Sequence, residues 1–214
     1  MSEHVAAIAS AHKYNVVSCS SHAIETGIVD VNAYDAVDLV LGLEKYAANQ
    51  TRYYKTFAPV MKNTLTRYLA NGGKLLVSGA YVGSDNAETG DTGREWLART
   101  LHVCWDGAAK TGSLNGISGL GVNGIGIYDT PNADHYCVQS ADKLSPAPGA
   151  FTAMLYADGS PAAVGFDGSQ ASDEMGYQPK PSRTFVMGFP LESITDRLTQ
   201  ANIMRGIMTF LMDK

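Results

Sequence analysis

Hydrophobic residues recur at helical spacing in four segments of the chain, and each segment predicts a helix. These segments are residues 2–14, 56–71, 94–101 and 191–214. In the first segment, Val5, Ile8 and Ala9 form the apolar face. In the last segment, Ser193 and Thr195 are candidate caps that precede a long amphipathic face.

Short runs of apolar and β-branched residues lie between these helices and predict strands. The runs are residues 15–20, 36–41, 74–78 and 183–190. The run at 36–41 is nearly all apolar, which is typical of a parallel strand covered on both faces. Short buried strands that alternate with helices indicate an α/β fold with three layers.

The pattern changes between residues 103 and 182, where glycine becomes frequent and helical periodicity disappears. Residues 151–168 contain two runs of β-type residues around a turn at Asp158 and Gly159, which predicts a hairpin. We interpret residues 103–182 as an antiparallel β-rich insertion within a single domain, residues 1–214. A chain of 214 residues can bury one substantial core.

The composition argues against several functions. Hydrophobic residues make up 45% of the chain and the net charge is -5, which fits a globular protein without a nucleic-acid footprint. No apolar run approaches the roughly 18 residues of a membrane span. Cys19, Cys104 and Cys137 lack the spacing of a zinc or redox site, and the glycine-rich run at 119–126 lacks the lysine of a phosphate-binding loop. We therefore expect no metal, no cofactor, no nucleic acid and no membrane span.

The stretch GGKLLVSGAYVGSD, residues 72–85, raises the main functional question. Ser78 ends a predicted strand, and a strand end is where α/β enzymes often place a nucleophile. A serine nucleophile needs a neighbouring base, and His22 or His135 could reach that edge of the sheet. The other interpretation is that Ser78 is only a small residue at the end of a strand.

Three stretches, YDAVDLVLGLEK, LTRYLANGGKLLVSGAYVGSD and TFVMGFPLESITDRLTQANIMRGIMTFL, together resemble the class I glutamine amidotransferase-like superfamily. The chain is most similar to the amidotransferase-like domain of bacterial proteins labelled xanthan lyase. This resemblance implies a flavodoxin-like three-layer sandwich with a mostly parallel sheet. It also implies a fragment that lacks the family's first strand, and a larger, exported, carbohydrate-related parent in the periplasm or outside the cell.

The same resemblance implies where catalytic residues would stand. Gly42 falls at the oxyanion loop, Ser78 at or next to the nucleophile, and Glu192 at the orienting carboxylate. Pro190 falls where the family has its histidine, and proline cannot accept a proton. The resemblance therefore implies a catalytically degenerate member, a pseudoenzyme.

Two functional hypotheses follow. The first is a scaffold or binding module that associates with other domains of a longer protein and holds a carbohydrate or peptide. Its expected ligand-binding residues are Gly42, Glu44, Ser78, Gly79, Tyr81 and Glu192. The missing strand would leave an open sheet site for a homo-oligomer. The second is a serine hydrolase or amidase that uses Ser78 with a relocated histidine, whose nitrogen should lie within roughly 3 Å of the hydroxyl.

Overall fold

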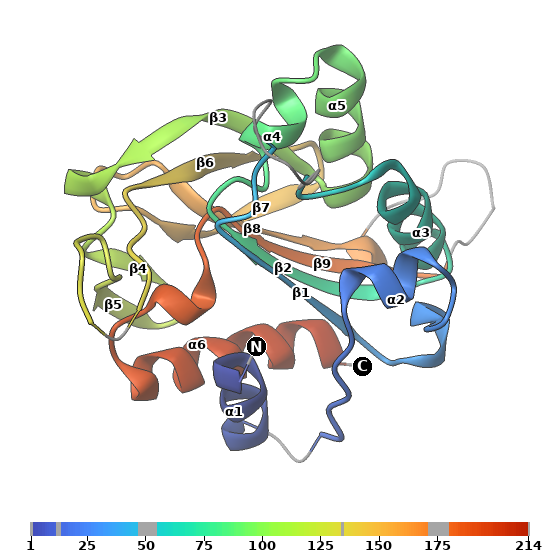
Figure 1. The fold of residues 1–214 in the computed structure, drawn as a ribbon, viewed down its shortest axis with the longest axis horizontal. Coiled ribbons are helices and arrows are strands. Elements are labelled where there is room, and N and C mark those ends of the chain that lie inside the picture. The colour runs from blue at the N-terminus through green and yellow to red at the C-terminus, as the bar shows by residue number, and fades with distance from the viewer. Residues whose placement is uncertain (1, 12–13, 47–54, 134, 171–179, 214) are drawn as a thin grey trace.

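A computed structural model describes residues 2–11, 14–46, 55–133, 135–170 and 180–213. Its main element is a seven-stranded mixed sheet that curls into a half-barrel (Figure 1). In sheet order the strands are β1 (Val37–Gly42), β2 (Lys74–Gly79), β9 (Arg183–Met187), β8 (Pro161–Asp167), β7 (Ala150–Leu155), β4 (Ile117–Gly119) and β5 (Val122–Ile125). A second, two-stranded sheet pairs β3 (Val103–Lys110) with β6 (Ser140–Pro146).

Helices cover both faces of the sheet next to β1, β2 and β9 (Figure 1). One face carries α1 (Ser2–Ala11) and α6 (Arg197–Met212). The other face and its rim carry α2 (Ser21–Glu25), α3 (Pro59–Ala70), α4 (Ser84–Ala87) and α5 (Asp91–Trp96), which continues as a π-helical turn, Leu97–Leu101. Short 3-10 helices are η1 (Val31–Ala33), η3 (Thr111–Ser113), η4 (Gly168–Gln170) and η5 (Leu191–Ser193).

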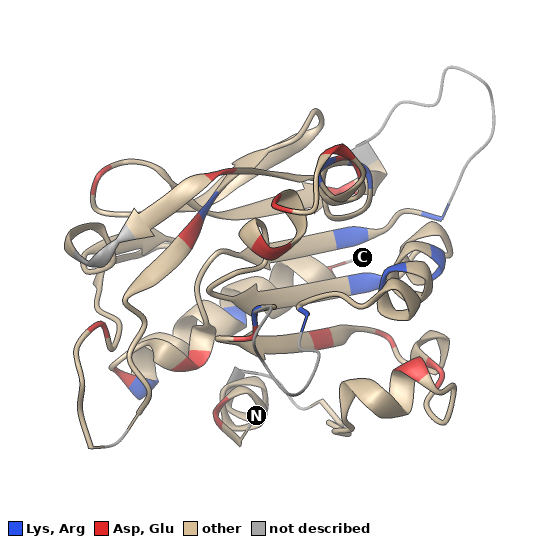
Figure 2. Cartoon of the chain, turned by 45° about the horizontal axis from the view of Figure 1, so that its top comes forward, with Lys and Arg blue, Asp and Glu red and all other residues tan. Residues whose placement is uncertain are grey.

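Alternation along the central strands divides the hydrophobic interior into two cores. Leu76 and Phe185 belong to the core beneath α1 and α6. Leu75, Val77 and Val186 belong to the core beneath α3. Strands that are buried on both faces appear in a sequence as continuous apolar runs, as β2 and β9 do, whereas in β1 only Leu39 and Leu41 are buried. Figure 2 shows acidic and basic residues interspersed over the elements, in keeping with the modest net charge.

The expected flavodoxin-like three-layer sandwich is wrong. Only β1, β2 and β9 run parallel, whereas β8, β7, β4 and β5 continue the same sheet in antiparallel pairing. Residues 163–167 of β8 pair directly with β9. Within residues 103–182, the strands β4, β5, β7 and β8 therefore belong to the main sheet and not to a separate insertion. The predicted hairpin, β7 and β8, joins that sheet because β8 pairs with β9.

Two local predictions are also wrong. Residues 15–20 form no strand, and Val16 and Val17 are exposed, because a β-branched run becomes a strand only where one of its faces can be buried. The last helix begins after Asp196, whose carboxylate accepts a hydrogen bond from the Thr199 amide at 2.7 Å. The hydroxyl of Ser193, a predicted cap, instead donates to the carbonyl of Pro190.

Candidate functional site

Ser78 lies at the end of β2 between two neighbouring strands, paired with Val40 of β1 and Met187 of β9. It faces the core beneath α6, together with Leu76 and Ala80. Its side chain is 0% exposed, and its Oγ has no hydrogen-bond partner among the described residues. Ser78 is therefore an isolated polar group within an apolar layer. Buried hydroxyls without a partner are uncommon in proteins.

The described histidines are engaged elsewhere or exposed, and His12 lies outside the described residues. His22 is exposed on α2. The His135 Nε2 lies 2.8 Å from Glu3 Oε1, and the imidazole of His102 stacks on Phe166, where burial lowers its pKa to about 4. None of these described imidazoles hydrogen-bonds to the Ser78 hydroxyl.

The remaining described histidine, His4, forms the centre of a buried polar group that the sequence did not reveal. Its Nδ1 lies 2.7 Å from Asp38 Oδ2 on β1, and its Nε2 lies 3.0 Å from Glu192 Oε2 on η5. Tyr136 donates its hydroxyl hydrogen to Glu192 Oε1 at 2.7 Å. We call His4, Asp38, Tyr136 and Glu192 the His4 cluster. It ties α1, β1, η5 and the loop before β6 together.

The pKa shifts of His4 and Glu192 both favour the charged form of each side chain. Burial lowers the pKa of His4, but the hydrogen bonds and charges of Asp38 and Glu192 outweigh it and raise that pKa to about 9. Burial also opposes ionisation of Glu192, yet the contacts with His4 and Tyr136 prevail and lower its pKa. Burial and the nearby Glu192 raise the pKa of Tyr136. At neutral pH the cluster is a charged imidazolium between carboxylates, which has no free nitrogen to serve as a base.

Two glycines expected at the site serve close packing. Gly42 has a φ of +53°, and a Cβ there would lie 3.5 Å from Glu192 Oε1 and from the Tyr136 hydroxyl. Gly42 therefore lies against the His4 cluster in a conformation that favours glycine. A Cβ on Gly79 would lie 2.8 Å from the Leu41 Cβ, so the paired ends of β1 and β2 leave no room for a side chain there.

Glu44 and Tyr81 lie at the rim of the same strand ends. Glu44 is half-buried, and its pKa is raised by burial and then by the charges of Asp85 and Glu25. The Lys45 ammonium lies 5.2 Å from the centre of the Tyr81 ring. No hydrogen bond among the described residues joins Glu44 or Tyr81 to Ser78 or Glu192. Of the expected set, Gly42 lies beside Glu192, and the set as a ligand site stays a prediction.

Two buried aspartates were missed. Asp85, on α4, is 3% exposed and accepts hydrogen bonds from the Thr56 amide and hydroxyl, each at 3.0 Å. Asp142 accepts from the Gly83 amide at 2.7 Å and the Trp105 indole at 3.0 Å, and burial raises its pKa to about 6. Their partners lie far away in sequence, so no local motif identifies them. Both act as anchors for backbone amides.

The sequence of α1 contains one indication that His4 is buried. Within residues 2–10 of α1, the buried positions are His4, Ala7 and Ile8, whereas Ala9, on the predicted face, is exposed. A histidine on the inner side of a short apolar helix requires a polar partner. Shifting the predicted helical face by one residue would have identified His4 as a residue to explain.

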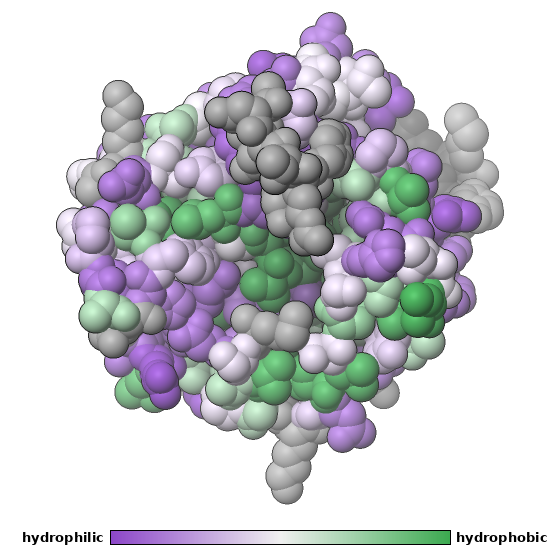
Figure 3. All heavy atoms as spheres, viewed as in Figure 1, coloured by the Kyte–Doolittle hydropathy of each residue, from purple (hydrophilic) through white to green (hydrophobic). Residues whose placement is uncertain are grey.

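The described part of the chain was compared with two further kinds of site, a metal centre and a membrane-spanning helix. Its His, Cys, Asp and Glu residues form no group of three or more suited to a metal ion. Its helices are too short or too polar to cross a bilayer. The face in Figure 3 mixes hydrophilic and hydrophobic residues, with a small hydrophobic group near its centre. Two surface hollows of about 540 and 530 Å³ are lined by neither Ser78 nor Glu192.

Comparison with known proteins establishes the fold alone. No family model matches the chain, and no curated protein matches it. Among solved structures, the mmIFT52 N-terminal domain is 11% identical with a TM-score of 0.53, covering 94% of this chain and 86% of that one. Cytoplasmic Protein STM3548 from Salmonella typhimurium is also 11% identical, with a TM-score of 0.56, covering 97% of this chain and 85% of that one.

These findings overturn the resemblance to amidotransferases and to xanthan lyase. Neither structural neighbour is described as such a protein, and the curled mixed sheet differs from the expected sandwich. Short glycine-containing strand ends recur in many α/β sheets, so their order along one chain was a weak criterion. The descriptions as bacterial, exported, carbohydrate-related and lacking a first strand rested on that resemblance and are withdrawn with it.

Proposed function

We propose that this chain is a non-catalytic binding module. Its strand-end residues stabilise the fold, and it associates with another polypeptide through its surface. The observation that carries the proposal is the environment of Ser78, the expected nucleophile. It is 0% exposed and its hydroxyl has no described hydrogen-bond partner.

A serine hydrolase requires that substrate reach the hydroxyl and that a base accept its proton. Burial of Ser78 opposes the first requirement, and the engagement of both His4 nitrogens by carboxylates opposes the second. These facts favour a structural role for the strand ends over a hydrolase or amidase that uses Ser78.

Binding is supported by the edges of the sheet. Of the six expected ligand-binding residues, Ser78, Gly79 and Glu192 are buried, so the strand ends offer little to a ligand. The outermost strands are β1 and β5, each paired with another described strand on one side only. Open edges accept additional strands through their backbone groups, so we favour a peptide ligand, with self-association through an edge as the alternative.

The test is labelling with a fluorophosphonate, which modifies activated serines. The intact chain and Ser78→Ala are incubated with the reagent beside an active serine hydrolase, and intact mass is measured. We expect no adduct on either form while the hydrolase is fully modified. Stoichiometric modification of the intact chain that disappears in Ser78→Ala would overturn the proposal.

A further inference from the structure

Asparagine is followed by glycine at Asn71, Asn115 and Asn123, and all three asparagines are exposed. Such a pair can react without an enzyme, because the glycine amide nitrogen can attack the carbonyl carbon of the asparagine side chain. Glycine favours this attack, since it has no side chain to stand in the way. The two groups must also come together in the right geometry. Reactivity in the folded chain therefore depends on what else holds the carboxamide and the amide.

The pair at Asn71 is held by its glycine. The Gly72 amide donates a hydrogen bond to the Leu69 carbonyl at 2.9 Å. A Cβ added to Gly72 would lie 2.6 Å from the Lys180 Cβ, so this glycine packs closely against another segment. The Asn71 Nδ2 also donates to Asn32 Oδ1 at 3.4 Å. Moving the Gly72 nitrogen onto the Asn71 side chain would break these contacts.

The pair at Asn115 is held by both of its groups. The Asn115 Nδ2 donates to Asp129 Oδ2 at 2.6 Å, and its Oδ1 accepts from the Ile127 amide at 3.0 Å. The Gly116 amide donates to the Ile125 carbonyl at 2.9 Å. These hydrogen bonds would have to be lost before the Gly116 nitrogen could reach the side chain, and each loss costs free energy.

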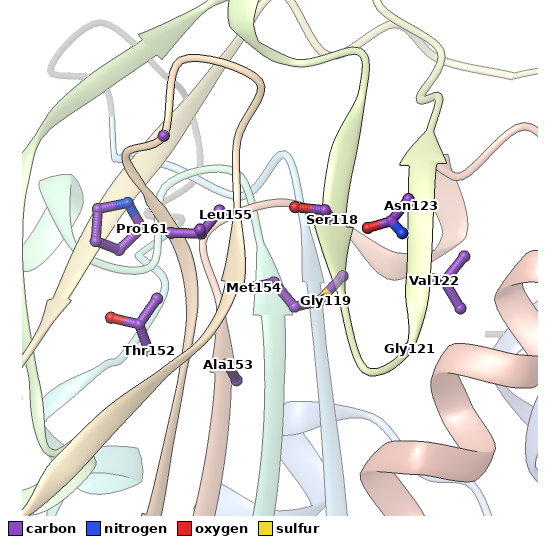
Figure 4. A pocket seen from close by; sticks show the side chains of 11 residues that line it. Ser118, Gly119, Gly121, Val122, Asn123, Thr152, Ala153, Met154, Leu155 and Pro161 are labelled. Carbon is purple, nitrogen blue, oxygen red and sulfur yellow. The ribbon is translucent and has the colours of Figure 1, made fainter.

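The pair at Asn123 lies in an irregular part of β5, and Asn123 lines a hollow of about 540 Å³ (Figure 4). The strand pairs with β4 through Val122 and Ile125, and the register shifts between them, so neither Asn123 nor Gly124 has a paired residue. The Asn123 carboxamide forms no hydrogen bond with the residues that the structure describes. A Cβ on Gly124 would meet no atom within 4 Å. This pair therefore lacks the contacts that hold the other two.

We propose that Asn123 is a site of spontaneous deamidation in the folded chain. The Gly124 amide nitrogen forms a bond to the Asn123 Cγ, the Cγ–Nδ2 bond breaks, and ammonia leaves with the proton of the amide. Water then hydrolyses the cyclic imide at one of its two carbonyls, which gives aspartate or isoaspartate. The inference does not rest on the proposed function, because it needs neither a partner nor a catalytic residue.

The product changes the hollow beside β5. None of the described residues that line it is Asp, Glu, Lys or Arg, so deamidation would give this lining a negative charge. Isoaspartate would also add a carbon to the backbone of β5, which is the outermost strand at this end of the sheet.

The test compares the three sites within the unmodified chain. The protein is incubated at pH 8 and 37 °C in water enriched in heavy oxygen, then digested with pepsin in ordinary acidic water and analysed by peptide mass spectrometry. Deamidation during the incubation takes up heavy oxygen and adds three daltons, whereas deamidation during digestion adds one. Asn115 is the matched internal control, because residues 115–117 and 123–125 share the sequence Asn-Gly-Ile.

We expect Asn123 to convert at least tenfold faster than Asn115 and Asn71 in the folded chain. In guanidinium chloride, which removes the folded contacts, Asn123 and Asn115 should convert at similar rates. Asn123→Gln should abolish the fast signal, and Asn115→Gln should retain it. A folded rate at Asn123 less than tenfold above that at Asn115 overturns the inference. An equal preference for Asn123 in the unfolded chain also overturns it, since the cause would then be local sequence and not the fold.

Discussion

The His4 cluster predicts that the chain loses stability as the pH rises through about 9. The pKa of His4 is raised from 6.5 to about 9 in the folded chain. Its contribution is therefore fully present below pH 6.5, declines above that value, and is lost as the pH passes about 9. A difference of about 2.5 between the two pKa values corresponds to about 3 kcal/mol, at roughly 1.4 kcal/mol for each tenfold change.

The variant His4→Gln isolates this contribution from other titrations. The groups that face His4 are Asp38 and Glu192 directly, and Tyr136 through Glu192, and all of them are retained in the variant. Removing one partner of a buried ion pair costs about 3–5 kcal/mol, so His4→Gln should be clearly less stable at pH 6.

The assay is urea unfolding at pH 6, 8 and 10, followed by the fluorescence of Trp96 and Trp105. The difference in unfolding free energy between the intact chain and His4→Gln should shrink by about 3 kcal/mol from pH 6 to pH 10. A difference that stays constant within about 0.5 kcal/mol over that range would mean that His4 is not a buried imidazolium, and the charge assignment would be refuted.

Three further changes test the same interior. Ser78→Ala should leave the free energy of unfolding unchanged or raise it by about 1 kcal/mol, because it removes a buried hydroxyl without a described partner. A clear fall in melting temperature by calorimetry would mean that the hydroxyl does have a partner. Tyr136→Phe should cost about 1–2 kcal/mol in urea unfolding, because Glu192 loses a hydrogen bond; an unchanged midpoint would argue against that contact. Asp142→Ala should cost about 3 kcal/mol and shift the emission of Trp105, whose indole donates to that carboxylate; an unaltered spectrum would argue against it.

The sequence predicted the elements whose signal is local. The strands β2 and β9 are buried on both faces and β1 on one face, and all three appear as apolar runs. The helices α3 and α6 show clear helical periodicity. The β7–β8 hairpin is marked by the turn at Asp158 and Gly159. Such features depend on residues a few positions apart, which periodicity and turn chemistry describe well.

The assembly of these elements could not be predicted in the same way. Nothing in β8 indicates that it will pair with β9, yet that pairing converts a sandwich into a curled sheet. His4 meets partners 34 and 188 residues away, Asp38 and Glu192, and no spacing rule relates positions that far apart. The expected site did not include His4 for the same reason, since the contact between His4 and Glu192 arises only on folding.

The packing of α1 across the start of α6 has a consequence for rearranged chains. Ser2 and Arg197 line the same hollow, so the chain begins near the start of α6 and ends at its far end. That helix has 16 residues and is therefore about 24 Å long. A linker of about eight extended residues could join the two ends. A circularly permuted chain reopened at Gly159, an exposed turn, should then recover the same architecture.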